Sequence, residues 1–307
     1  MKDAMDQSTK RPDRDQRHTR AERAKDDLGA SLEAPTFGEI KERAPASARL
    51  VHETIRAEGE AEMRRPVGSL AWSGLAAGLA MGFSLVVEGL LHAGLPDEPW
   101  RGLISSFGYS VGFLIVILGR QQLFTESTLT VVLPALHRRT APVLLRMVRM
   151  WAVVLSANLV GVVAFAAMAA LTDVFTPEAR AAFAEIGRAA LEGDAWTTFL
   201  RAIVAGWLIA LMVWLMPEAG SARFLVIVTI TYVVALAGLA HVIAGSVEAT
   251  FAAFAGDASW REVVVGFLLP ALAGNIVGGV TLTALLNYGQ VHAELENDGS
   301  VDGREPD

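Results

Sequence analysis

The stretch FLVIVTITYVVALAGLAHVIAGSVEATFAAFAG, residues 224–256, decides the fold of this chain. It is long and almost entirely apolar, and a histidine, His241, lies near its middle. An ionisable side chain at bilayer depth costs free energy unless it faces the protein interior or a water-filled path. Gly238 and Gly245 flank this histidine, so we predict a membrane segment whose helix is interrupted at a functional position.

The rest of the chain is apolar in the same way. It has 307 residues, of which 52% are hydrophobic, and a mean hydropathy of +0.39. A helix that spans a bilayer needs about 20 mostly apolar residues. Six stretches meet this requirement: residues 70–91, 103–133, 143–171, 196–216, 224–254 and 263–286. We therefore predict an all-α membrane protein with six transmembrane helices, embedded in a lipid bilayer. There are no cysteines, which excludes disulfides.

A second interruption is predicted in the second apolar stretch, at LGRQQLFTEST, residues 118–128. Its charged and amide side chains cannot lie in a continuous helix that faces lipid. Stretches two and five hold matching places in two halves of three spans each. Because the number of spans in a half is odd, the halves form an inverted repeat. Interrupted segments in matching places are typical of a transport site between inverted repeats.

Basic residues near the span ends predict the orientation. They are Arg64, Arg65, Arg138, Arg139, Arg146, Arg149 and Arg223, whereas the loops on the other face, residues 97–101, 172–194 and 256–262, are acidic or balanced. Both termini are therefore expected in the cytoplasm. The expected organisation is a disordered cytoplasmic tail over 1–35, a cytoplasmic or interfacial helical segment over 36–67, a transporter or channel domain over 68–290, and an acidic cytoplasmic tail over 291–307.

Five short motifs carry a family resemblance. They are QLFT at 122–125, NLVG at 158–161, LMVW at 211–214, HVIA at 241–244 and GNIVGG at 274–279. In this order and spacing, over residues 37–293, the chain resembles the formate/nitrite transporter family. Gln122, Ala240 and Gly245 replace an acidic residue, a glutamate and an asparagine that are common there, and Gly206 replaces an asparagine of the fourth helix. These departures resemble the divergent YfdC-like branch.

The resemblance implies an aquaporin-like protomer with its own pore, a homopentamer, a bacterial inner-membrane location, and small monovalent anions such as formate or nitrite as substrates. It also implies a pore centre of Thr125 and His241. The apolar constrictions carry over to Tyr109, Phe113, Leu123, Phe124, Ile209 and Val234. Histidine is suited to giving a proton to a weak-acid anion, so passage past His241 with possible proton coupling is expected.

Other interpretations of these residues stay open. His241 could instead bond the open backbone between Gly238 and Gly245, and a threonine such as Thr125 can bond its own helix. Arg120 and Glu126 either pair across the second interruption or face the cytoplasmic pore mouth with Gln122. We interpret Asn158 and Asn275, in comparable places of spans three and six, as hydrogen-bonding links between helices.

Two rival function classes remain. One is a channel for neutral solutes or cations on the same fold, and the other is a non-conducting membrane scaffold or sensor. An enzyme is not predicted, because no paired carboxylates, metal-ligand cluster or Ser/His/Asp arrangement lie at a shared depth. We expect no metal, no cofactor and no nucleic-acid partner.

Overall fold

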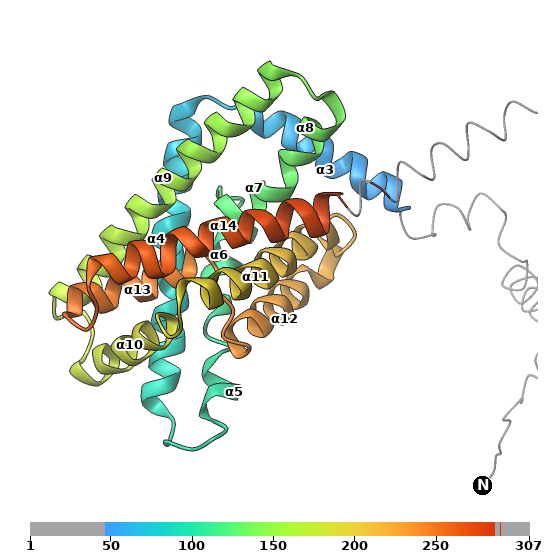
Figure 1. Ribbon diagram of the computed structural model, residues 1–307. Helices are drawn as coiled ribbons and strands as arrows, with labels where there is room; N and C mark the ends of the chain where they lie inside the picture. Colours follow the sequence, from blue (N-terminus) through green and yellow to red (C-terminus); the bar gives the residue numbers. More distant parts are fainter. Residues whose placement is uncertain (1–46, 286–288, 290–307) are drawn as a thin grey trace, which may run out of the picture. The chain divides into compact units, whose positions relative to one another are not determined.

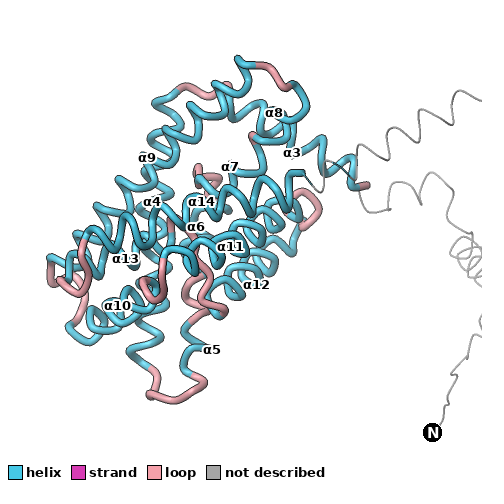
Figure 2. The backbone as a smooth tube through the Cα atoms, in the orientation of Figure 1, coloured by secondary structure: helices cyan, strands magenta, loops and turns pink. Residues whose placement is uncertain are grey.

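The computed structural model describes residues 47–285 and 289. Within these residues the chain is helical, with no β-strand (Figures 1 and 2). The expected tails at 1–35 and 291–307, and the first part of the expected segment 36–67, lie outside the described residues. The remainder of that segment forms the helix α3 (Ala48–Met63), which begins where the Ser47 hydroxyl accepts a hydrogen bond from the Leu50 N–H at 3.3 Å.

The apolar stretches form two groups of helices. The first group is α4 (Val67–Gly94), α5 (Arg101–Ser105), α6 (Ser110–Leu118), α7 (Phe124–Thr130), α8 (Val132–Arg138) and α9 (Ala141–Leu171). The second is α11 (Ala195–Leu215), η1 (Gly220–Ala222), α12 (Arg223–Leu236), α13 (Ala244–Ala255), η2 (Glu262–Leu268), α14 (Leu269–Val277) and η3 (Gly278–Leu285). The helix α10 (Pro177–Ala190) joins the two groups (Figure 1).

The length and surface of these helices suit a bilayer. Within the described part of the chain, five helices are long and apolar enough to cross a membrane, and Gly220–Leu236 is a shorter apolar helix. Large apolar side chains point outward from them; Trp72 and Leu145 are 75% and 71% exposed. Soluble proteins rarely leave so much contiguous apolar surface in water. The chain is an integral membrane protein.

Both predicted interruptions fall between two helices of one apolar stretch. The first separates α6, which ends at Leu118, from α7, which begins at Phe124. The second separates α12, which ends at Leu236, from α13, which begins at Ala244. Each contains a residue in the left-handed region, Arg120 with φ 50° and Gly238 with φ 58°. Glycine adopts this conformation without strain, whereas a side chain such as that of Arg120 does so at a cost.

The last apolar stretch holds a feature that the sequence analysis did not predict. Two π-helical turns, η2 and η3, lie on either side of α14. Pro270 is the second residue of α14 and has no N–H to donate. The regular α-helical ladder is therefore lost at this point, and wider turns accommodate the change.

The two groups of helices repeat the same close packing. A side chain added at Gly78 would overlap the main chain of Asn158, and one added at Gly206 would overlap the main chain of Asn275. In the reverse direction, Gly161 lies against α4, and Gly278 lies against α11. Small residues allow helices in a membrane to approach this closely. The repetition agrees with the predicted inverted repeat of the fold class.

Candidate functional site

The first interruption is held by one buried asparagine. Asn158, on α9, accepts a hydrogen bond at Oδ1 from the Phe124 N–H at 3.0 Å. Its Nδ2 donates to the carbonyl oxygens of Gly74 at 2.7 Å and Gln122 at 2.9 Å. One side chain thus pairs two main-chain groups that the broken helix leaves open, Phe124 N–H and Gln122 C=O, and ties them to the Gly74 carbonyl of α4. Unpaired, each would be costly in an apolar interior.

Asn275 does the same for the second interruption. Its Oδ1 accepts from the Val242 N–H at 2.8 Å, and its Nδ2 donates to the carbonyl oxygens of Ala202 at 2.8 Å and Ala240 at 2.9 Å. The interpretation of both asparagines as hydrogen-bonding links between helices is confirmed. We call these two arrangements the asparagine clamps.

The two interruptions meet at Thr125 and His241. Thr125 is the second residue of α7, and His241 lies in the segment just before α13. The Thr125 Oγ1 and His241 Nε2 atoms are 2.8 Å apart, and both residues are completely buried. A contact across 116 residues of sequence joins the two halves of the fold at one point.

The other ring nitrogen of His241 fixes its tautomer. Its Nδ1 accepts hydrogen bonds from the Ile243 N–H at 3.3 Å and the Ala244 N–H at 3.1 Å. Main-chain N–H groups only donate, so Nδ1 carries no proton. In the neutral ring the proton lies on Nε2, which donates it to the Thr125 oxygen. His241 therefore also bonds the open backbone at the start of α13, as its structural interpretation expected.

The six residues expected as apolar constrictions are all buried in one apolar core around this pair. Phe113 lies edge-on to the His241 ring at a centroid distance of 4.9 Å, and Tyr109 lies 5.4 Å from Phe113. Phe124 packs against Trp151. The remaining three are Leu123, just before α7, Ile209 on α11 and Val234 on α12. A row of contacting rings thus runs from His241 through Phe113 to Tyr109.

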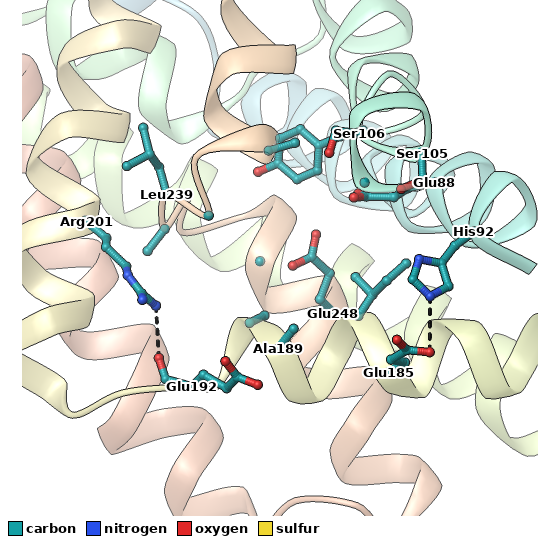
Figure 3. Close-up of a pocket in the computed structure, with 18 of the residues that line it drawn as sticks. Glu88, His92, Ser105, Ser106, Glu185, Ala189, Glu192, Arg201, Leu239 and Glu248 are labelled. Atoms are coloured by element: carbon teal, nitrogen blue, oxygen red, sulfur yellow. Dashed lines mark hydrogen bonds and ion pairs between the residues drawn. The ribbon is translucent and has the colours of Figure 1, made fainter. Parts of the chain in front are cut away.

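Tyr109 also lines a cavity of about 370 Å³, which we call the α10-side cavity. Leu239 and Ala240, the residues before His241, line it too. Figure 3 shows the carboxylates of Glu88, from α4, and Glu248, from α13, directed into it. At its edge the His92 Nε2 atom lies 3.1 Å from the Glu185 Oε2 atom (Figure 3).

On the opposite end of α4, the helix α3 covers the first interruption. The Glu62 carboxylate accepts hydrogen bonds from Gln122 Nε2 and from Thr130 Oγ1, both at 2.9 Å. Burial raises the pKa of the Glu62 carboxyl above its ordinary 4.5, and the nearby Glu58 adds to the rise. The hydrogen bonds from Gln122 and Thr130 lower this pKa and so offset part of the rise. Gln122, expected at the pore mouth, is buried under α3.

The other two residues expected at the pore mouth lie apart from each other. Arg120 is exposed, and Glu126, on the first turn of α7, is half-buried and faces Glu62 and Glu58 of α3. No ion pair within 4.0 Å joins Arg120 to Glu126 in the described part of the chain. Residues 47–285 also hold no group of three histidine, cysteine or acidic side chains that could bind a metal ion.

Two acidic residues of these regions were not among the expected site residues. Glu88 is the only charged residue in the first apolar stretch, 70–91, and that isolation was a usable signal. Glu62 gave no such signal, because it lies among other charges just before the first span. Its contact with Gln122 depends on the docking of α3, which the sequence pattern does not reveal.

Comparison with known proteins agrees with this architecture. The family model described as "Formate/nitrite transporter" matches residues 49–289. The chain is 39% identical over 265 residues, 86% of each protein, to "Inner membrane protein YfdC" of Escherichia coli (strain K12). It is 24% identical over 290 residues to the "Probable formate transporter" of Methanothermobacter thermautotrophicus, covering 85% of this chain and 98% of that protein.

Two solved structures have the same fold. A "Pentameric formate channel with formate bound" matches with a TM-score of 0.63 at 22% identity, covering 74% of this chain and 98% of that chain. An "FNT family ion channel" matches with a TM-score of 0.66 at 21% identity, covering 78% and 98%. Members of the matched family are transporters and channels rather than enzymes. With its family match, its close relative and its shared fold, this chain belongs to the formate/nitrite transporter family.

Proposed function

We propose that this protein conducts small monovalent anions of weak acids, of the formate and nitrite type, past Thr125 and His241. The observation that carries the proposal is the 2.8 Å contact between the Thr125 hydroxyl and the His241 ring, where the two helix interruptions meet. The names of the related formate channel and the probable formate transporter support this substrate class. The family match supports transport in general.

The tautomer of His241 suggests how an anion would be received. Because Nε2–H donates to the Thr125 oxygen, the hydroxyl hydrogen of Thr125 is available to an acceptor such as a carboxylate or nitrite oxygen. The surrounding core is apolar, and transfer into such a medium favours the neutral acid over its anion. Passage coupled to one proton is therefore the favoured form of transport.

Assembly and location follow from the relatives. We infer a homopentamer in a bacterial inner membrane, with one pore in each protomer and both termini in the cytoplasm. The support for the pentamer and the membrane is the pentameric formate channel of the same fold and the inner-membrane relative. The support for the orientation is the set of basic residues near the span ends. Native mass spectrometry of the protein in detergent checks the oligomer; a monomer as the largest species in mild detergent contradicts it.

Flux measurements in proteoliposomes test the function. Formate, nitrite, a neutral solute such as glycerol, and ammonium are compared over about pH 5 to 8, the range in which an ordinary histidine titrates. We expect formate or nitrite flux in the wild type and a loss of about tenfold or more in His241→Ala and Thr125→Val. Such a loss corresponds to about 1.4 kcal/mol or more of missing stabilisation of the anion during passage.

Thr231→Val is the matched control. Thr231 is as buried as Thr125, but its hydroxyl bonds Ser110 at 2.8 Å and the Ile227 carbonyl at 2.7 Å, away from His241. Anion flux that is the same in all variants rules out a role for the pair. Flux of glycerol or ammonium alone supports the neutral-solute or cation channel, and no flux of any solute supports the non-conducting scaffold.

A further inference from the structure

We propose that Glu88 and Glu248 form a proton-binding site in the α10-side cavity, which gives its proton to the anion before the anion reaches Thr125 and His241. This proposal rests on the proposed function and names the source of the proton. Neither residue belongs to the Thr125–His241 centre. Their chemistry nevertheless governs what can enter from this side, because the cavity extends to Ala240, the residue before His241.

Glu248 is buried in the cavity wall without a partner. Only 8% of the residue is exposed, and its carboxylate forms no hydrogen bond or ion pair with any described residue. Figure 3 shows it directed into the cavity from α13. A buried carboxylate normally has hydrogen-bond donors or a cation beside it, because isolating a charge from water is expensive. No group of the described chain therefore neutralises Glu248, and a positively charged species bound in the cavity would stabilise it.

Glu88 occupies the facing wall of the same cavity, on α4, and interacts electrostatically with Glu248. The Tyr109 phenol lies close to both carboxylates. The basic side chains nearby have other partners: the Arg201 guanidinium donates to the Glu192 main-chain carbonyl at 3.0 Å, and His92 lies beside Glu185. No cation of the described chain lies within 4.0 Å of either Glu88 or Glu248.

Two facing carboxylates would repel an anion at the point where it must pass. Like charges in a partly apolar cavity disfavour each other, and one proton bound by the pair lowers both this repulsion and the repulsion of an anion. A divalent metal is a poorer candidate for the positive charge, since the described residues offer no third ligand of histidine, cysteine or acidic type. The arrangement of the two carboxylates therefore favours a proton, rather than a metal ion, as the positive charge that they bind.

The proton transfer breaks one O–H bond and forms another. A carboxyl O–H of the pair breaks, and an O–H bond forms on the anion, which then moves inward as a neutral weak acid. The pair, which carries one negative charge while it holds the proton, becomes doubly negative and takes a new proton from the solution that fills the cavity. Tyr109 lines the cavity with the pair, and its ring contacts Phe113, which contacts His241, so the neutral acid would pass Tyr109 on its way inward.

Infrared difference spectroscopy of the full-length protein in lipid tests the site without any transport substrate. A protonated carboxylic acid has a carbonyl stretch that a carboxylate lacks. We expect a component of this band in the wild type at low pH that is lost as the pH is raised and that is missing from the double variant Glu88→Gln/Glu248→Gln. Bands of other carboxyls, such as Glu62, are common to the two proteins and cancel in the difference between them. Glu192→Gln is the control, because this exposed residue lines the same cavity but lies outside the pair.

Several results overturn the proposal. One is a wild-type spectrum that equals the spectrum of the double variant at every pH, and another is a Glu192→Gln spectrum that lacks the same component as the double variant does. A band abolished by sodium, potassium or ammonium at constant pH assigns the site to a metal or ammonium cation instead. Flux separates the two proposals: if the pair is right, its glutamine variants lose the pH dependence of anion flux, whereas His241→Ala lowers flux and keeps the infrared band.

Discussion

Removal of the Asn158 side chain would leave the Phe124 N–H and the Gln122 carbonyl at the interruption without their partner, and would remove an additional hydrogen bond to the Gly74 carbonyl of α4. We expect Asn158→Ala to lower the free energy of unfolding by roughly 2–5 kcal/mol, the cost of leaving buried main-chain groups open. Asn275→Ala should have a similar effect, because its bonding pattern is the same. Thermal unfolding in detergent measures both.

Replacement of either asparagine by aspartate changes the hydrogen bonds and keeps the size of the side chain, so it separates the two effects. Asp keeps the acceptor for the N–H group but turns an oxygen towards two carbonyl groups, so Asn158→Asp should be at least as damaging as Asn158→Ala. An unfolding temperature of Asn158→Asp equal to that of the wild type would show that the two donated bonds contribute nothing.

The site residues that could be predicted were those with polar or ionisable side chains in apolar stretches of sequence. His241 stands out in an apolar run, and the interrupted second stretch pointed to Thr125 only through a resemblance to a known family. The hydrogen bonds from Ile243 and Ala244 to His241 could not be predicted, because they depend on the local path of the backbone. For the same reason the sequence left the structural and the functional interpretations of His241 open. In the structure its Nδ1 atom bonds the backbone, and its Nε2 atom makes the contact with Thr125 on which the proposed function rests.

At the scale of elements, the contact of α3 with the rest of the chain depends on a glycine. Pro134, in α8, has no N–H to donate to the Thr130 carbonyl, and Gly59 of α3 packs against that oxygen. A side chain at Gly59 would overlap it. We expect Gly59→Ala to weaken the docking of α3 by about 1–3 kcal/mol, measured as faster tryptic cleavage after Arg56.

Gly68→Ala is the matched control for this experiment. Gly68 lies in the first turn of α4, nine residues further on, and nothing lies within 4 Å of a side chain added there. Its tryptic pattern should equal that of the wild type. Equal cleavage rates in Gly59→Ala and Gly68→Ala would contradict the close approach of α3 to Thr130.

The docking of α3 should also depend on pH through Glu62. Its pKa in the docked state is raised above 4.5, chiefly by burial, so docking favours the protonated carboxyl. The stabilising contribution is fully present below 4.5 and is lost as the pH rises through the raised value. Spin labels at Ala57→Cys and Ser221→Cys, in a chain without native cysteines, should report a smaller docked fraction at high pH.

A second group on α3 titrates in the opposite sense. Burial lowers the pKa of His52 below its ordinary 6.5, so protonation of His52 at low pH opposes docking. Comparison of the docked fraction of α3 between the wild type and Glu62→Gln isolates the contribution of Glu62, because His52 is present in both proteins. A docked fraction with the same pH dependence in the two proteins would assign the effect to other groups.

Element positions were more predictable than their internal geometry. The ends of α9 and α11 lie within two residues of the predicted ends of their apolar stretches, since length and hydropathy define a membrane helix well. The π-helical turns η2 and η3 were missed. They arise from the packing of Gly278 against α11 and from Pro270, and hydropathy carries no information about either.

At the scale of the whole molecule, the orientation in the membrane is open to a direct test. The basic loops predict that Thr140 and Ser221 face the cytoplasm and that Glu98 and Asp173 face the other side. Single cysteines at these four exposed positions should react with an impermeant maleimide accordingly. In intact cells only Glu98→Cys and Asp173→Cys should be labelled, and the pattern should reverse in inside-out vesicles. Labelling of Thr140→Cys in intact cells would contradict the predicted topology.

The two asparagine clamps have a consequence for biosynthesis. Every group of the first clamp lies between Gly74 and Asn158, and every group of the second lies between Ala202 and Asn275. Since synthesis proceeds from the N-terminus, the first half can complete its clamp while the second half is still on the ribosome. Each half can therefore enter the membrane with the open main-chain groups of its broken helix already hydrogen-bonded. The contact between Thr125 and His241 then forms last, as the step that joins two finished halves.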